Sequence, residues 1–136
     1  MSTLSSNTGD AERLRPHPDE RFADPVQSID LGAARAQLVA EAAAAPHRHR
    51  QKTLIRCGGT TVALFHFSQG SGLPEHLTHG IVTIHVLEGH LTVHAQNQTH
   101  ALPAGQILVL AKNIKHDVQA DQETFMLLTV HLENAH

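Results

Sequence analysis

The sequence predicts an all-β protein, an antiparallel barrel or sandwich, preceded by one short helix and a flexible arm. Three observations support this fold class. About seven short runs rich in β-branched residues follow one another between residues 53 and 132. Turn-forming residues separate these runs at regular spacing, and no helical pattern interrupts them. The length of 136 residues fits a single domain with its own core.

Composition divides the chain into three parts. Residues 1–28 are rich in Ser, Asp, Arg and Pro and have almost no apolar periodicity, so we expect a flexible N-terminal arm. Residues 29–46 are rich in Ala and contain the short helix. Residues 47–136 form the β-barrel domain, because all the β-type runs lie there.

The helical pattern runs roughly over residues 32–45. Leu31, Leu38 and Ala42 fall on one face, and Pro46 ends the pattern. This apolar stripe is narrow and the segment is short, so the helix would not be stable alone. We therefore expect it to dock on the barrel or on a neighbouring subunit.

The β-type runs are short and bounded by turn sequences. They are residues 53–56, 60–67, 81–88, 90–95, 99–102, 107–111 and 124–132. The last run is almost continuously apolar, as expected for a strand covered on both faces. Gly89 and Gly105 lie at the ends of runs, where we expect backbone conformations that residues with a Cβ resist.

Charge and composition exclude several classes of partner. The formal net charge is −3, with 10 Lys and Arg against 13 Asp and Glu, so no basic field attracts nucleic acid or anionic lipid. No apolar run approaches the ~20 residues that span a bilayer. Cys57 is the single cysteine and cannot form an intramolecular disulfide, and the N-terminus lacks a secretory pattern. We expect a soluble, cytoplasmic protein.

Thirteen histidines are the compositional oddity. Two of them stand in glycine-anchored blocks, from Gly70 to Gly89 and from Gly105 to His116. In the first block His76 follows Gly70 by six residues, and in the second His116 lies eleven residues after Gly105. Together the blocks suggest a barrel with a histidine-lined mouth.

The spacing of these blocks resembles the two motifs of the cupin family, the double-stranded β-helix or jelly-roll barrels. The family's first motif is G, five residues, H-x-H, three or four residues, E, six residues, G. Here Gly70, His76, Thr78, Val82 and Gly89 keep that spacing but only one of the three polar ligands. The resemblance covers about residues 52–132 and implies a small cupin-type jelly-roll barrel.

The second cupin motif is G, five residues, P-x-G, two residues, H, three residues, N. This chain keeps the first glycine and the histidine, as Gly105 and His116, while Asn113 stands at the third position of P-x-G and Ala120 at the final asparagine. The first motif's last glycine and the second motif's first are separated by 15 residues, as in small bacterial cupins. Small cupins are frequently dimers, so the resemblance also implies a homodimer.

In metal-dependent cupins, the motif histidines and glutamate bind one divalent ion. Carried over, only His76 and His116 remain, and we expect them to face each other across the barrel. A catalytic metal normally needs at least three protein ligands. His79, three residues after His76, is the favoured third ligand; other candidates are His66 and His131. The ion would be zinc, nickel, iron or manganese.

Strand alternation predicts the lining of the barrel. If Val82 points inward, so do Ile84 and Val86, and with Thr78 they would line a pocket for a small, mostly apolar ligand. By the same rule His85, His90 and His94 should face outward, while Leu91 and Val93 point inward.

Three functions remain open. The chain would be a small-molecule-binding cupin with a histidine-only metal site, a metal-free binding or sensor barrel, or mainly an oligomerisation module. For His76 and His116, coordination of a metal competes with hydrogen bonding to a ligand or within the barrel. No reaction and no catalytic residue follow from the sequence.

Overall fold

The computed structural model describes residues 24–44 and 49–133. These residues form one α-helix and nine β-strands, and all the strand pairs are antiparallel. The elements are α3 (Leu31–Ala44), β1 (His49–Cys57), β2 (Thr60–Phe67), β3 (Gly72–His76), β4 (Ile81–Glu88), β5 (His90–Ala95), β6 (Gln98–Pro103), β7 (Ile107–Leu110), β8 (His116–Ala120) and β9 (Thr124–His131).

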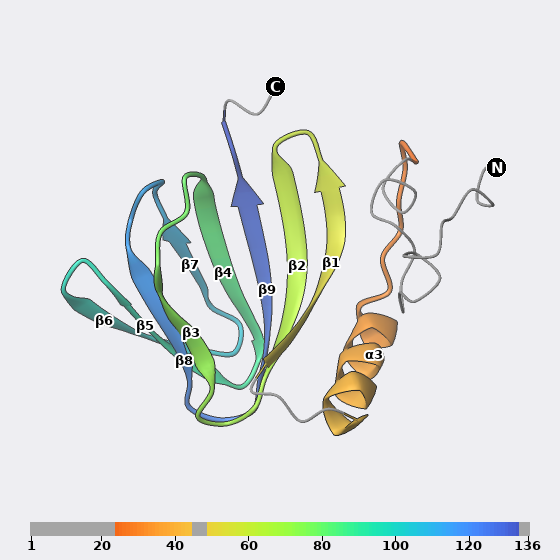
Figure 1. Ribbon diagram of the computed structural model, residues 1–136, viewed down its shortest axis with the longest axis horizontal. Coiled ribbons are helices and arrows are strands. Elements are labelled where there is room, and N and C mark those ends of the chain that lie inside the picture. Colours follow the sequence, from red (N-terminus) through yellow and green to blue (C-terminus); the bar gives the residue numbers. More distant parts are fainter. Residues whose placement is uncertain (1–23, 45–48, 134–136) are drawn as a thin grey trace.

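The strands form two sheets that face each other (Figure 1). The five-stranded sheet has the order β1-β2-β9-β4-β7, and the four-stranded sheet has the order β3-β8-β5-β6. Side chains from both sheets make one buried core, with partly buried Leu, Ile and Val residues packed against it. The prediction of an all-β jelly-roll barrel with one short helix is therefore confirmed.

Side chains alternate between the core and the outside along each strand. On β4 and β5 the buried residues are Val82, Ile84, Val86, Leu91 and Val93. His85 and His90 are half-buried and His94 is exposed; His85 and His94 each stand between two buried residues, and His90 is followed by the buried Leu91. The predicted orientation of these histidines, away from the core, is confirmed, because successive residues of a strand point to opposite faces.

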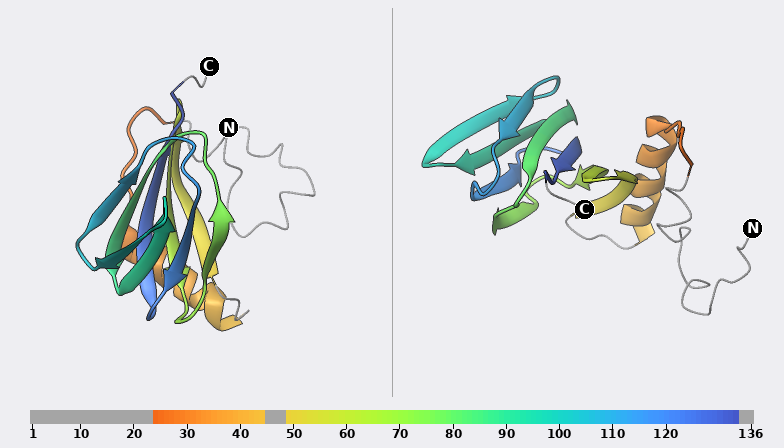
Figure 2. Two further views of the ribbon diagram at one scale, coloured as in Figure 1. Left: turned by 90° about the vertical axis from the view of Figure 1, so that its left-hand side faces the viewer. Right: turned by 90° about the horizontal axis from the view of Figure 1, so that it is seen from above.

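The helix packs on the outer side of β1 and β2 (Figures 1 and 2). Asp30 caps its first turn, since the Asp30 Oδ1 atom accepts a hydrogen bond of 3.0 Å from the Ala33 backbone N–H. Ala34 and Leu38 are buried against Leu54 and Leu64 of the two strands. The expected docking of the helix is on the barrel itself.

Parts of two predicted segments lie outside the described residues. Of the predicted arm, only residues 24–28 are described; apart from a bend at residues 25–26, they have no regular secondary structure. The predicted end of the helix at Pro46 also lies outside, because the described helix stops at Ala44. Within the described residues, no helix is long and apolar enough to cross a membrane.

Two glycines at strand ends have the backbone conformations predicted for them. The φ angle is 102° at Gly89 and 92° at Gly105, a region that side chains with a Cβ disfavour. A Cβ at Gly89 would also collide with the Glu123 carbonyl oxygen, because β4 and β5 meet the start of β9 there. Gly89 is therefore required both by its conformation and by close packing.

Two strands of the structure, β3 and β8, were absent from the sequence prediction. β3 has the sequence G-L-P-E-H and β8 the sequence H-D-V-Q-A, and neither has a run of β-branched residues. They form because they pair with each other and because β8 pairs with β5 over five consecutive residue pairs. These are the two strands that hold His76 and His116.

Candidate functional site

His76 and His116 are neighbours at one end of the four-stranded sheet. His76 is the last residue of β3, His116 is the first residue of β8, and the two are cross-strand partners. Their ring centroids are 4.3 Å apart, with an angle of 57° between the ring planes. We expected the two imidazoles to face each other across the barrel, and that was wrong. They lie side by side on adjacent strands, because the two motif blocks pair directly.

Both imidazoles are oriented by the same kind of hydrogen bond. The Nδ1 atom of His76 lies 2.8 Å from the Pro74 carbonyl oxygen, and Nδ1 of His116 lies 2.9 Å from the Ile114 carbonyl oxygen. A carbonyl oxygen only accepts, so each Nδ1 carries the proton. In the neutral form of each ring, Nε2 then carries the lone pair that could bind a metal ion or accept a hydrogen bond.

The pair combines one buried and one accessible ring. The His116 residue is 3% exposed, whereas His76 is exposed. Next to His116 in the sheet stands Ala95, whose small side chain occupies little space beside the ring. A ligand would therefore approach from the side of His76, and His116 would form the inner wall.

The loop after β3 holds Thr78 and His79 against the loop before β8. The Asn113 backbone N–H donates a 2.8 Å hydrogen bond to the Thr78 carbonyl oxygen, and His79 Nδ1 lies 3.0 Å from Asn113 Oδ1. Asn113 has a φ of 64°, a left-handed conformation that asparagine tolerates better than most residues. It stands where the cupin motif has glycine, and its role in joining the two loops was not predicted.

Two other candidate ligands point away from the pair. His66 shares the outer face of β2 with Leu64, and its Nε2 lies 2.8 Å from Glu123 Oε2. His131 is exposed, with Nδ1 3.0 Å from Thr60 Oγ1. In residues 24–44 and 49–133, no three His, Cys, Asp or Glu side chains are grouped so that they could hold a metal ion. A third ligand from His79 stays a prediction.

The predicted pocket residues are placed in two different settings. Val82, Ile84 and Val86 point inward and belong to the buried core, with exposed fractions of 2%, 1% and 0%. Thr78 is half-buried in the loop after β3. The three valine and isoleucine side chains are thus part of the packed core between the sheets, and their contact with a ligand stays a prediction.

Two ionisable groups have perturbed pKa values. A hydrogen bond from the Thr92 hydroxyl is the main cause that lowers the pKa of Asp121; burial raises this pKa by less, and the hydrogen bond and charge of His90 lower it further. Burial lowers the pKa of His49, whose ring stacks on Phe65 with the centroids 6.0 Å apart. Both groups lie outside the His76–His116 pair.

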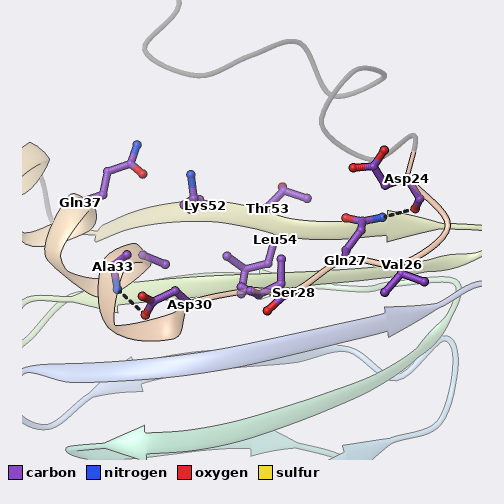
Figure 3. A pocket seen from close by; sticks show the side chains of 12 residues that line it. Asp24, Val26, Gln27, Ser28, Asp30, Ala33, Gln37, Lys52, Thr53 and Leu54 are labelled. Carbon is purple, nitrogen blue, oxygen red and sulfur yellow. Dashed lines mark hydrogen bonds between the residues drawn. The ribbon is translucent and has the colours of Figure 1, made fainter.

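Three pockets open on the surface of residues 24–44 and 49–133, and neither His76 nor His116 lines these three. A pocket of about 430 Å³ lies between the segment before α3, the helix itself and β1 (Figure 3). It has no histidine or cysteine, and its Asp30 carboxylate already caps the helix. Pockets of about 380 and 300 Å³ share Glu75 and His94 on the outside of the four-stranded sheet. The chemistry of the pocket beside the helix does not resemble that of the histidine pair.

Two histidine–aspartate pairs on the outer face of the four-stranded sheet were not predicted. His94 Nδ1 lies 2.8 Å from Asp117 Oδ1, and His90 Nδ1 lies 2.6 Å from Asp121 Oδ2. The outward orientation of both histidines followed from alternation, but their partners did not. The alternation of H-D-V-Q-A would have placed Asp117 outward, had this segment been identified as a strand.

Comparisons with known proteins agree with this architecture. The cupin domain family model matches residues 63–131, which is 69 of the 136 residues. A cupin superfamily protein from Desulfitobacterium hafniense has 15% sequence identity and a TM-score of 0.61, over 93% of this chain and 99% of that chain. No curated protein shows significant similarity.

Two further solved structures have higher identity over a shorter part of the chain. An RmlC-like cupin from Desulfovibrio desulfuricans has 25% identity and a TM-score of 0.58, covering 62% of this chain and 83% of that one. A conserved protein of unknown function from Streptococcus pyogenes has 23% identity and a TM-score of 0.58, covering 61% and 73%. These similarities concern the barrel.

Proposed function

Because the chain belongs to the cupin family, we propose that it binds a small molecule through His76 and His116, where β3 ends and β8 begins. In this proposal the two imidazoles hold a divalent transition metal, zinc, nickel, iron or manganese, and the small molecule binds next to that ion. The observation that carries the proposal is the shared hydrogen-bond pattern of the two rings.

Each Nδ1 is committed to a backbone carbonyl oxygen, at 2.8 Å for His76 and 2.9 Å for His116. Metal-binding histidines generally donate their second ring N–H to such an acceptor, which sets the tautomer and the ring orientation. Both Nε2 atoms are therefore prepared to act as ligands. The 4.3 Å separation of the ring centroids brings the two rings to one place.

Two imidazoles are an incomplete set for a resident metal. Structural and catalytic zinc sites have three or four protein ligands, and fewer ligands leave more positions to water. We therefore expect an ion held here to bind more weakly than in a full cupin site and to keep several positions for a ligand. When bound, such an ion would act as a Lewis acid toward a coordinated molecule or water.

The grouping of side chains also favours a second candidate, a metal-free binding barrel. No three metal-binding side chains are grouped in the described residues, and the core between the two sheets is apolar. In that case the same two Nε2 atoms would accept hydrogen bonds from a small, mostly apolar ligand. Both candidates use His76 and His116. The same double variant of these two histidines, with one control variant, therefore serves to test either candidate.

The first experiment is elemental analysis of untagged protein purified without chelators, followed by calorimetric titration with zinc and nickel. We compare the wild type with the double variant His76→Ala/His116→Ala. The control is His85→Ala/His131→Ala, which also reduces the 13 histidines to 11 but leaves the pair intact. Near one equivalent of metal that is lost only in the first variant would support the metal site.

Two results would count against the metal site. Absence of metal and of calorimetric binding in the wild type would leave the metal-free candidate, to be pursued with small-molecule libraries. Equal binding in all three proteins would show that metal attaches to other histidines on the surface, and the role assigned to His76 and His116 would then be wrong.

We also propose that the chain forms a homodimer through the outer face of β4, β7 and β9. Ile107 and Val109 of β7 are 57% and 61% exposed there, whereas the helix packs mainly on β1 and β2, with Leu87 of β4 and Leu127 of β9 at the margin of that contact. Exposed apolar side chains on an edge strand are a frequent basis for association. Analytical ultracentrifugation of the wild type and of Ile107→Ser/Val109→Ser should show a dimer and a monomer respectively; a monomeric wild type would refute the dimer.

A further inference from the structure

We propose that His94 and Asp117 are positioning residues for His116, and this inference rests on the function proposed for the His76–His116 pair. His94 Nδ1 and Asp117 Oδ1 are 2.8 Å apart on the outer face of the four-stranded sheet. The two residues are cross-strand partners, and the adjacent pair in the same ladder is Ala95 with His116. The hydrogen bond thus joins β5 to β8 one residue away from the buried imidazole.

The start of β8 has weak support from its other neighbour. His116 is the first residue of β8 and follows a loop that contains the left-handed Asn113. On the β3 side, the register is interrupted between Leu73 and His76. On the β5 side, the five residue pairs are consecutive. The position of the His116 backbone therefore depends mainly on β5, and the His94–Asp117 bond reinforces that contact at its end.

Asp117 acts through the backbone and not through direct contact with a ligand. Successive residues of a strand point to opposite faces, so the Asp117 side chain points outward while the His116 ring points inward. A carboxylate only accepts hydrogen bonds, so His94 Nδ1 donates to it. Because His116 Nδ1 bonds to the Ile114 carbonyl two residues earlier, a shift at the start of β8 would change that bond and the ring orientation.

The structure contains a matched control for this inference. His90 and Asp121 form a second pair, with Nδ1 and Oδ2 2.6 Å apart, at the other end of β5. Asp121 also accepts a 2.7 Å hydrogen bond from the Thr92 hydroxyl. Removing His90 therefore breaks a histidine–aspartate hydrogen bond of the same chemistry. This bond also starts from β5, but four residues away from His94. Its effect on His116 should be absent.

The test uses His94→Ala, Asp117→Ala, Asp117→Asn and His90→Ala. Imidazole nitrogen NMR of the metal-free proteins reports which nitrogen of His116 carries the proton, and zinc titration reports the affinity. We expect His94→Ala and Asp117→Ala to mix the two tautomers of His116 and to weaken zinc binding about tenfold or more. Asp117→Asn keeps an oxygen acceptor and should retain the wild-type spectrum and affinity, as should His90→Ala.

Two outcomes would overturn the inference. An unchanged His116 spectrum in His94→Ala and Asp117→Ala would show that the pair does not position the ring. An equal change in His90→Ala would show a general loss of strand stability. If His94→Ala does not fold, His94→Thr replaces it, because threonine favours strands. A wild type that binds no zinc refutes the metal site alone, since the metal-free spectra still decide the positioning.

Discussion

The guanidinium carbon of Arg35 lies 4.2 Å from the centroid of the Phe125 ring, so a helix side chain covers an aromatic side chain of β9. Arg35 also forms an ion pair with Glu88 at the end of β4. Phe125 in turn contacts the His66 ring, with the centroids 4.9 Å apart. The helix is thus attached to the end of the barrel by a polar contact as well as by its apolar face.

Arg35→Ala should lower the free energy of unfolding by about 1 kcal/mol, because an exposed cation–π contact and a surface ion pair are each weak. Glu88→Gln removes only the ion pair and should have a smaller effect. Urea denaturation measures both. Equal losses in the two variants would show that the Phe125 contact contributes nothing.

Leu38→Ala should be far more destabilising than a change on the exposed side of the same helix. Leu38 is 0% exposed, and its loss should lower the free energy of unfolding by about 2 to 5 kcal/mol. Val39→Ala, at a residue that is 46% exposed, should change it by less than about 0.5 kcal/mol. Thermal and urea unfolding test this; a small loss in Leu38→Ala would mean that the helix does not dock as described.

Gly89→Ala should be more destabilising than Gly105→Ala. Both residues have positive φ, which costs a residue with a Cβ about 1 to 2 kcal/mol. An added Cβ meets nothing within 4 Å at Gly105 but collides with the start of β9 at Gly89. Denaturant midpoints of the two variants provide the comparison, and equal midpoints would contradict the close packing at Gly89.

His49 should make stability depend on pH below neutrality. Burial lowers the pKa of His49 below its ordinary value of 6.5, so the unfolded chain binds the proton more readily. Its contribution is fully present above pH 6.5 and is lost as the pH falls below that value. His49→Phe keeps a ring beside Phe65 but cannot titrate, so its unfolding free energy should fall less on acidification. Parallel pH profiles would refute this role.

Asp121 should contribute in a more acidic range. Its pKa is lowered from 3.8, first by the Thr92 hydroxyl, so its stabilisation is present above pH 3.8 and is lost as the pH falls through the folded pKa. Thr92→Val removes that hydroxyl and should raise the pKa of Asp121 toward its ordinary value. Carbon NMR of the carboxyl group during a titration measures the shift. No change would assign the lowering to His90 instead.

Sequence patterns were sufficient to predict a strand where the residues of that strand themselves alternate between buried and outward positions. The alternation of Val82, Ile84 and Val86 with polar residues predicted both the strand and its inner face. The motif spacing predicted the barrel and selected His76 and His116 from thirteen histidines. Local patterns were not sufficient for β3 and β8, whose residues are extended because of the strands beside them.

The sequence by itself determined the fold class, the helix, most strands and the two histidines of the candidate site, because hydrophobic periodicity, turn residues and motif spacing are local properties. Tertiary structure alone decided that these histidines lie side by side, that Asn113 joins the two loops, and that His94 bonds to Asp117. Each of these contacts joins residues far apart in the chain, and strand pairing brings them together.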